Sequence, residues 1–210
     1  MEQKNKPLIF PLFSKVVYVK QTNIDCKKIL HLIKEPTMVS GENKKNKKYL
    51  LLSSINKEVL NQVKFKNLKK EIMKEFYEYA HQILHYENNK FKMTTSWFVE
   101  SNSGQKSGYH NHNNCMFSGC LYLKVNKNSG GINFNNYENF RFLLNPTRYD
   151  TLNARDFIIQ PETGTIIFFP SEMYHRVLEN KSNEKRISLA FNFFPVGHLG
   201  GTGDSKANIK

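Results

Sequence analysis

The chain has 210 residues, a length typical of one folded domain with a sizeable core. Its aromatic content of 13%, with 16 Phe and 10 Tyr, excludes a disordered chain and favours a β-rich interior in which large flat side chains pack between sheets. The net charge of +13 would suit a nucleic-acid or anion binder, but the lysines are scattered, so a solvated basic surface explains the charge better.

The cysteines and the N-terminus bear on the compartment. Cys26, Cys115 and Cys120 match neither a disulfide framework nor a zinc site, so we expect reduced, mostly buried thiols. The N-terminus is polar, and no apolar run approaches the roughly 18 residues that span a bilayer. We therefore expect a cytoplasmic protein with no membrane partner; its oligomeric state is left open.

The N-terminal part of the chain predicts one strand followed by a short helix. Residues 8–20 are dense in β-branched and aromatic side chains, which is typical of a strand. Asn23 or Asp25 can cap a short helix that runs to Ile33. The polar residues 42–48 then predict an exposed loop.

A longer helix is predicted over residues 67–85. Leu68, Ile72, Phe76 and Ile83 recur there at three- and four-residue spacing, or multiples of it, and form one apolar stripe. We expect this helix to pack against a sheet.

The pattern changes after residue 90 to short β-type runs broken by Gly, Pro and Asn turns. The predicted strands are 92–100, 116–125, 132–135, 140–144, 157–160, 165–169, 176–179 and 186–194. Eight short strands are typical of a sandwich or jelly roll. We expect a single domain over 1–196, with helical support at about 23–85 and a jelly-roll core at about 92–196, followed by a flexible tail at 197–210.

Three histidines, His110, His112 and His175, form a candidate metal site. His110 and His112 are two residues apart, so in an extended chain both side chains point the same way and can bind one ion. His175 lies at the start of a distant predicted strand. Two close ligands and one distant ligand occupy half an octahedron and leave positions for substrate and O₂. The other histidines, His31, His81, His85 and His198, are expected to be ordinary surface or packing residues.

Arg186 is a candidate anion site at the start of the last predicted strand. Alternation places Arg186, Ser188, Ala190 and Asn192 on one face and Ile187, Leu189 and Phe191 on the other. An arginine inside a small barrel requires an anion, and its planar guanidinium pairs bidentately with a carboxylate. A dicarboxylate cosubstrate would meet that demand, and Asn192 is a candidate for a hydrogen bond near it. The remaining arginines, Arg141, Arg148, Arg155 and Arg176, are expected to form surface ion pairs.

Short segments, weak one by one, become specific through their order and spacing. They are PLFSKVVYV near the N-terminus, TTSW at 94–97, His110-Asn111-His112, SGCLYL at 118–123, GGINF at 130–134, residues 161–164, FFPS at 168–171 with His175, and RIS at 186–188 leading to Phe191-Asn192. With these segments the chain resembles the Fe(II)- and 2-oxoglutarate-dependent dioxygenases, in particular a phage and bacterial branch of oxygenases related to prolyl hydroxylases. If the chain is phage-encoded, its compartment is the host cytoplasm.

The resemblance implies a double-stranded β-helix that binds Fe(II), 2-oxoglutarate and O₂. Carried over residue by residue, His110 and His175 become the two histidine ligands. Arg186 holds the far carboxylate of 2-oxoglutarate, with Ser188 and Tyr122 as hydroxyl partners. The chain departs from the family at the third ligand, because His112 stands where the triad has Asp or Glu. Loss of that anionic ligand is expected to weaken metal binding and to raise the reduction potential of the iron.

The resemblance makes hydroxylation of a peptidyl or amino-acid substrate, with release of succinate and CO₂, the expected activity. Two alternatives stay open: an oxidative demethylase of nucleic acid, which the charge of +13 favours, and a jelly-roll binding or structural protein without metal. Salt-sensitive binding of DNA or RNA would indicate the first, and absence of Fe(II) binding the second. The sequence does not name the substrate.

Overall fold

The structure is a computed structural model that describes residues 7–33, 51–136, 145–200 and 206–210. The loop predicted over 42–48 and the strand predicted over 140–144 lie outside these ranges. Among the described residues, no helix is long and apolar enough to cross a membrane. The three cysteines are free thiols, as predicted.

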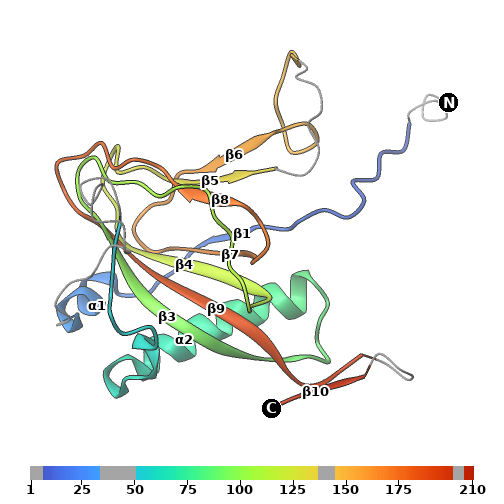
Figure 1. Cartoon of the computed structure of the whole chain (residues 1–210), viewed down its shortest axis with the longest axis horizontal. Coiled ribbons are helices and arrows are strands. Elements are labelled where there is room, and N and C mark those ends of the chain that lie inside the picture. Colours follow the sequence, from blue (N-terminus) through green and yellow to red (C-terminus); the bar gives the residue numbers. More distant parts are fainter. Residues whose placement is uncertain (1–6, 34–50, 137–144, 201–205) are drawn as a thin grey trace.

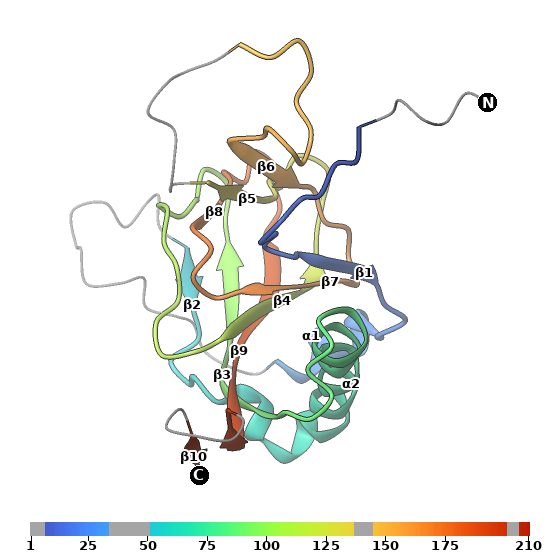
Figure 2. The same cartoon turned by 90° about the vertical axis from the view of Figure 1, so that its right-hand side faces the viewer.

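Two antiparallel sheets form the body of the protein. The larger sheet has the order β1-β7-β4-β9-β3-β2, with β10 paired to β9, and the smaller sheet has the order β6-β5-β8. The strands of the larger sheet are β1 (Tyr18–Gln21), β2 (Leu52–Ser53), β3 (Lys90–Ser101), β4 (Phe117–Lys124), β7 (Thr165–Pro170), β9 (Arg186–Leu199) and β10 (Ala207–Ile209). Those of the smaller sheet are β5 (Ile132–Asn135), β6 (Asp156–Ile159) and β8 (His175–Val177). The smaller sheet lies on one side of the larger sheet and helix α2 (Lys66–Tyr77) on the other (Figures 1 and 2), so the jelly-roll prediction is confirmed.

Strand β9 shows how the alternation divides the larger sheet into two faces. Ile187, Leu189, Phe191 and Phe193 point to the helix side, where they join the main apolar cluster. Arg186 and Asn192 point to the opposite side, where their side chains bond to residues of the loops around the smaller sheet and to His112. The predicted alternation of this strand is therefore confirmed, and it places the polar face between the two sheets.

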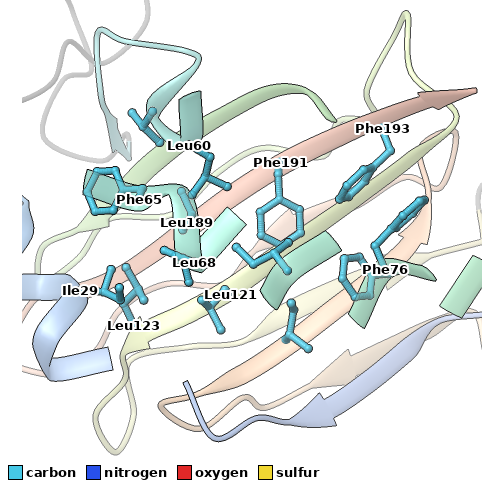
Figure 3. Close-up of a cluster of buried hydrophobic side chains, with 14 of the residues drawn as sticks. Ile29, Leu60, Phe65, Leu68, Phe76, Leu121, Leu123, Leu189, Phe191 and Phe193 are labelled. Carbon is cyan, nitrogen blue, oxygen red and sulfur yellow. The ribbon is translucent and has the colours of Figure 1, made fainter. Parts of the chain in front are cut away.

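Helix α2 covers the apolar face of the larger sheet, as the three- and four-residue spacing predicted. Leu68, Ile72 and Phe76 are buried, and the helix continues as a π-helical turn, η4 (Glu78–Ile83). The ring of Phe76 stacks on Phe193 with centroids 3.8 Å apart (Figure 3). Burying such a side chain stabilises the fold by about 1.5–3 kcal/mol, so this layer anchors the sheet that carries the site.

The two ends of the chain differ from the prediction. Of residues 8–20 only the last part is a strand, because β1 begins at Tyr18 and pairs with β7, whereas Leu8 to Phe13 run as an exposed segment. The short helix α1 (Cys26–Leu32) is capped as predicted by Asp25, whose side chain accepts a hydrogen bond from Lys28 N. A flexible tail was expected over 197–210; in its described residues β9 runs on to Leu199 and pairs with β10. The expectation rested on the low apolar content of this segment, but backbone hydrogen bonds between β9 and β10 form without apolar side chains.

Two short 3₁₀ turns and two short strands were not predicted. They are η2 (Val59–Asn61), η3 (Val63–Phe65), β2 and β10. The 3₁₀ turns bring Leu60 and Phe65 under α2, where both are buried. Elements of two or three residues lack a measurable period, so tertiary packing decides them.

Candidate metal and cosubstrate site

The backbone brings His110 and His175 together. His110 N donates to His175 O and His175 N donates to His110 O, both at 2.9 Å, so the two residues form an antiparallel bridge. His112 N donates to Ser171 O at 3.0 Å, which ties the next histidine to the turn before β8. The segment that contains His110 and His112 thus lies beside residues 171–175, which end at His175.

The three imidazoles converge, as the sequence predicted. One ligand nitrogen from each of His110, His112 and His175 lies within 4.8 Å of the others. The ring centroids of His110 and His175 are 4.4 Å apart, and those of His112 and His175 are 5.1 Å apart. This spacing lets one ion reach all three residues.

Hydrogen bonds at Nδ1 fix which nitrogen of each ring is available. His110 Nδ1 lies 3.0 Å from Gly108 O, and His175 Nδ1 lies 2.9 Å from Met173 O. A carbonyl oxygen only accepts, so each Nδ1 carries its proton and each Nε2 keeps a free lone pair. Both histidines are therefore held in the tautomer that binds a metal through Nε2.

For His112, side chains rather than backbone carbonyls make the hydrogen bonds at Nδ1. Its Nδ1 lies 2.8 Å from Asn192 Oδ1 and 2.8 Å from Ser118 Oγ. Asn192 Nδ2 in turn donates to Thr95 Oγ1 at 2.9 Å, and Ser118 Oγ lies 2.8 Å from Ser171 Oγ. Asn192 was expected near the cosubstrate, but here both ends of its amide serve His112 and Thr95.

Thr95, Ser118 and Ser171 were missed by the sequence reasoning. Ser118 shares the two-residue alternation of β4 with Cys120 and Tyr122, so the period of that strand could have placed it on the site face. Thr95 is the partner of Asn192 across β3 and β9, a register that the sequence does not reveal. Ser171 lies in the turn that follows β7.

Burial keeps His112 and His175 neutral. It lowers the pKa of His175 to about 3, with a further contribution from the charge of His110, and the rings of Phe134 and Phe169 lie against this histidine. Burial is also the main cause that lowers the pKa of His112. Neutral imidazoles at pH 7 are the form that binds a metal, so no proton has to leave before an ion enters.

Arg186 forms the second half of the site. Its side chain is 2% exposed, and its Nη1 donates to Ser129 O at 2.8 Å and to Gly130 O at 3.0 Å. No carboxylate of the described residues pairs with it. Burial lowers the pKa of Arg186, because a buried cation without a counter-ion is costly.

The groups around Arg186 are neutral. Tyr122 and Ser188 are register partners on β4 and β9, and both are buried. Burial raises the pKa of Tyr122, and it raises the pKa of the Cys120 thiol to about 11. Cys120 was not predicted as a site residue. The structure thus brings together Arg186, Ser188 and Tyr122; their role toward a cosubstrate stays a prediction.

The residues present fit Fe(II) and 2-oxoglutarate. Three imidazole Nε2 atoms are a donor set that iron accepts, and among the described residues the set leaves other coordination positions for a cosubstrate and O₂. A buried guanidinium that lacks a carboxylate partner suits a dianionic cosubstrate. His112 stands where the resemblance leads one to expect Asp or Glu. Its hydrogen-bond partner Asn192 is also uncharged, so it adds no negative charge to the site.

Comparison with known proteins agrees with this geometry. Residues 95–192 match the sequence model of a family described as "Putative 2OG-Fe(II) oxygenase". This segment includes the three histidines, Arg186 and the Thr95–Asn192 pair. No curated protein matches the chain in sequence.

Solved structures of the same fold include several oxygenases. A prolyl-4-hydroxylase from Pseudomonas putida is 16% identical with a TM-score of 0.57, over 85% of this chain and 92% of that chain. A prolyl hydroxylase from Trichoplax adhaerens, in complex with a hypoxia inducible factor peptide fragment, is 13% identical with a TM-score of 0.58, over 85% and 83% of the two chains. An oxidoreductase of the 2OG-Fe(II) oxygenase family from Burkholderia pseudomallei is 12% identical with a TM-score of 0.56, over 80% and 77%. Residues 95–192 thus resemble the 2OG-Fe(II) oxygenases in sequence, and the chain as a whole shares its fold with solved oxygenases of that kind.

Proposed function

We propose that the chain is a dioxygenase of hydroxylase type that acts on a peptidyl or amino-acid substrate and forms succinate and CO₂. The observation that carries the proposal is the convergence of three imidazoles, each with a hydrogen bond at its Nδ1, between the same two sheets that enclose Arg186. The structure holds both groups in place before any ligand arrives, which is the preorganisation that this chemistry needs.

The residues divide the work between metal and cosubstrate. His110, His112 and His175 would hold the iron through Nε2, and Arg186 would hold the far carboxylate of 2-oxoglutarate, with the hydroxyls of Tyr122 and Ser188 beside it. When bound, iron and 2-oxoglutarate supply the oxidation by O₂ that yields succinate and CO₂ and inserts the second oxygen atom into a substrate C–H bond. The chain itself orients these ligands, and the buried rings of Phe134 and Phe169 exclude water between the sheets.

The neutral ligand set has a consequence for the metal. A carboxylate in place of His112 would offset one positive charge of the ion, whereas imidazole offsets none. The bond from His112 Nδ1 to Asn192 Oδ1 increases the donor strength of Nε2 and replaces part of that loss. Asn192 is thus a positioning residue for His112.

A groove beside the site supports a peptidyl substrate. It has a volume of about 780 Å³, and its apolar lining includes Phe13, Leu152, Phe157 and Met173. The groove also includes Phe134, whose ring centroid lies 5.9 Å from that of His175. An extended peptide with apolar side chains fits such a surface.

Strand β6 borders this groove, and among the described strands it pairs with β5 alone. It is the last strand of the smaller sheet, and Phe157 and Ile158 are 49% and 50% exposed. An edge strand with unpaired backbone groups can add an extended peptide by hydrogen bonding. Phe157 lines the groove and Ile158 does not, which offers a matched pair of variants.

The test is succinate formation from 2-oxoglutarate by the Fe(II)-loaded chain, screened with apolar peptides and with methylated oligonucleotides. We expect turnover with a peptide, loss of activity in His175→Ala, and a lower kcat/KM in Phe157→Ser but not in Ile158→Ser. Turnover with oligonucleotides alone would overturn the substrate class. A chain that binds no Fe(II) and forms no succinate would instead be a metal-free jelly-roll protein.

A further inference from the structure

A second groove lies beside strand β8 of the smaller sheet. Its volume is about 1150 Å³, and it is lined by Tyr109, Arg176, Gln160 and the loop 125–130. Arg176 and Tyr109 each adjoin a ligand histidine in sequence, but the alternation along the paired segments turns them to the face opposite His175 and His110. The side chains of Arg176 and Tyr109 are therefore turned away from the metal site.

Arg176 is fixed at this groove by an aromatic side chain. The guanidinium carbon lies 4.5 Å from the centroid of the Tyr109 ring. The Tyr109 hydroxyl donates to Asp156 Oδ1 at 3.0 Å and accepts from Asn133 Nδ2 at 3.0 Å. Because the ring is anchored at both polar contacts, the guanidinium keeps a defined plane without an ion pair of its own.

Two buried polar atoms at this point have no hydrogen-bond partner among the described residues. Arg176 was expected to be a surface ion-pair residue, but no carboxylate of the described residues pairs with it. In the described part of the chain, the buried side-chain atoms without a hydrogen-bond partner are Arg176 Nε and Asn133 Oδ1, and these residues are register partners on β8 and β5. A buried donor without a partner is destabilising, and an acceptor atom on a ligand would satisfy Arg176 Nε.

The rest of the groove is basic. Its charged lining consists of Lys106, Lys127, Arg176, Lys181 and one acid, Glu179. Lys106 pairs with Glu179 at 3.7 Å, whereas Lys127 and Lys181 form no ion pair with the described carboxylates. Three cations around one groove, Arg176, Lys127 and Lys181, thus have no ion-pair partner among the described carboxylates.

We propose that this groove binds a small phosphorylated ligand, with a phosphate group on the Arg176 guanidinium and the remaining charge on Lys127 and Lys181. A fixed planar guanidinium matches two phosphate oxygens, and two flexible ammonium groups accommodate a second phosphate. A diphosphate carries enough negative charge to balance these three cations, which a monocarboxylate does not. The single oriented arginine and the short basic rim favour a small ligand over a nucleic-acid strand. The proposal is independent of the substrate proposed above.

The test uses inorganic pyrophosphate as the probe and the full chain freed of metal, so that the probe meets no bound ion. Arginine Nε–Hε groups give their own signals in a ¹H–¹⁵N correlation spectrum, and the Arg176 signal is assigned by its loss in Arg176→Gln. We expect this signal to shift saturably on titration. Calorimetry should show affinity at least about tenfold weaker in Arg176→Gln and several-fold weaker in Lys127→Gln/Lys181→Gln.

The matched control is Arg148→Gln, because Arg148 is an exposed arginine paired with Asp150 outside the groove, and it should bind pyrophosphate like the parent chain. If Arg176→Gln does not fold, the lysine pair decides the question. An Arg176 signal that does not move, or variants that bind as tightly as the parent, would overturn the proposal. A single-stranded oligonucleotide that binds more tightly than pyrophosphate, and loses this affinity in the Arg176 variant, would overturn the small ligand in favour of nucleic acid.

Discussion

Replacing Asn192 by alanine should weaken metal binding about tenfold, or about 1.4 kcal/mol. Asn192 Oδ1 accepts from His112 Nδ1 at 2.8 Å, and the variant removes that acceptor. Loss of such a partner usually costs 10- to 100-fold in metal affinity. Here Ser118 Oγ, also 2.8 Å from His112 Nδ1, stays in place and keeps part of the orientation, so we expect the lower end of this range.

The assay is calorimetric titration of the metal-free chain with Co²⁺, together with the visible spectrum of the bound ion as a report on its ligands. Asn192→Asp should bind at least as tightly as the parent, because a carboxylate accepts from His112 Nδ1 more strongly than an amide. The control is Asn61→Ala, since Asn61 is exposed and bonds only to Glu58 and Lys69 among the described residues. Equal affinity in Asn192→Ala and the parent, with an unchanged spectrum, would refute the positioning role.

Three further predictions concern the affinity for the cosubstrate, the pH dependence of stability and the packing of the core. Arg186→Lys should weaken 2-oxoglutarate binding by about 1–3 kcal/mol and Arg186→Ala by more, with metal affinity unchanged; equal cosubstrate affinity in Arg186→Ala would remove the anion site from the account. His175 has a pKa of about 3 when folded and 6.5 otherwise, so between these values only the unfolded chain binds the proton, and the metal-free protein should lose stability to urea as the pH falls below about 6.5. A stability that is flat from pH 7 to 4 in the parent and in a His175→Gln variant alike would contradict this. Phe76→Ala should lower the free energy of unfolding by about 3–5 kcal/mol, because the ring is fully buried on Phe193; a loss below 1 kcal/mol would show that the helix does not anchor the sheet.

The local patterns of the chain are sufficient to predict most of the fold. The apolar spacing of Leu68, Ile72 and Phe76 identifies α2, and the alternation from Arg186 to Asn192 identifies both the strand and its polar face. The segment before Tyr18 misled the prediction, because β-branched and aromatic side chains are typical of strands but do not create a pairing partner. At the other end, β10 forms through backbone pairing with β9, which composition does not record.

The candidate site also contains some residues that the sequence predicts and others that it does not. The ligand histidines and Arg186 follow from residue type and spacing. The task of Asn192 does not, because it depends on the register that sets Asn192 opposite Thr95 and beside Ser118. Arg176 was taken for a surface residue since sequence cannot show that Tyr109 covers its guanidinium. Contacts between strands that are distant in the chain therefore remain beyond single-sequence reasoning.

The most direct test is a crystal structure of the chain loaded with metal and 2-oxoglutarate without O₂, with the ion located by anomalous scattering. We expect one ion bonded to Nε2 of His110, His112 and His175 at about 2.0–2.2 Å, with the far carboxylate of 2-oxoglutarate on Arg186. An ion bound by His110 and His175 alone, or a cosubstrate whose carboxylate lies away from Arg186, would contradict the account.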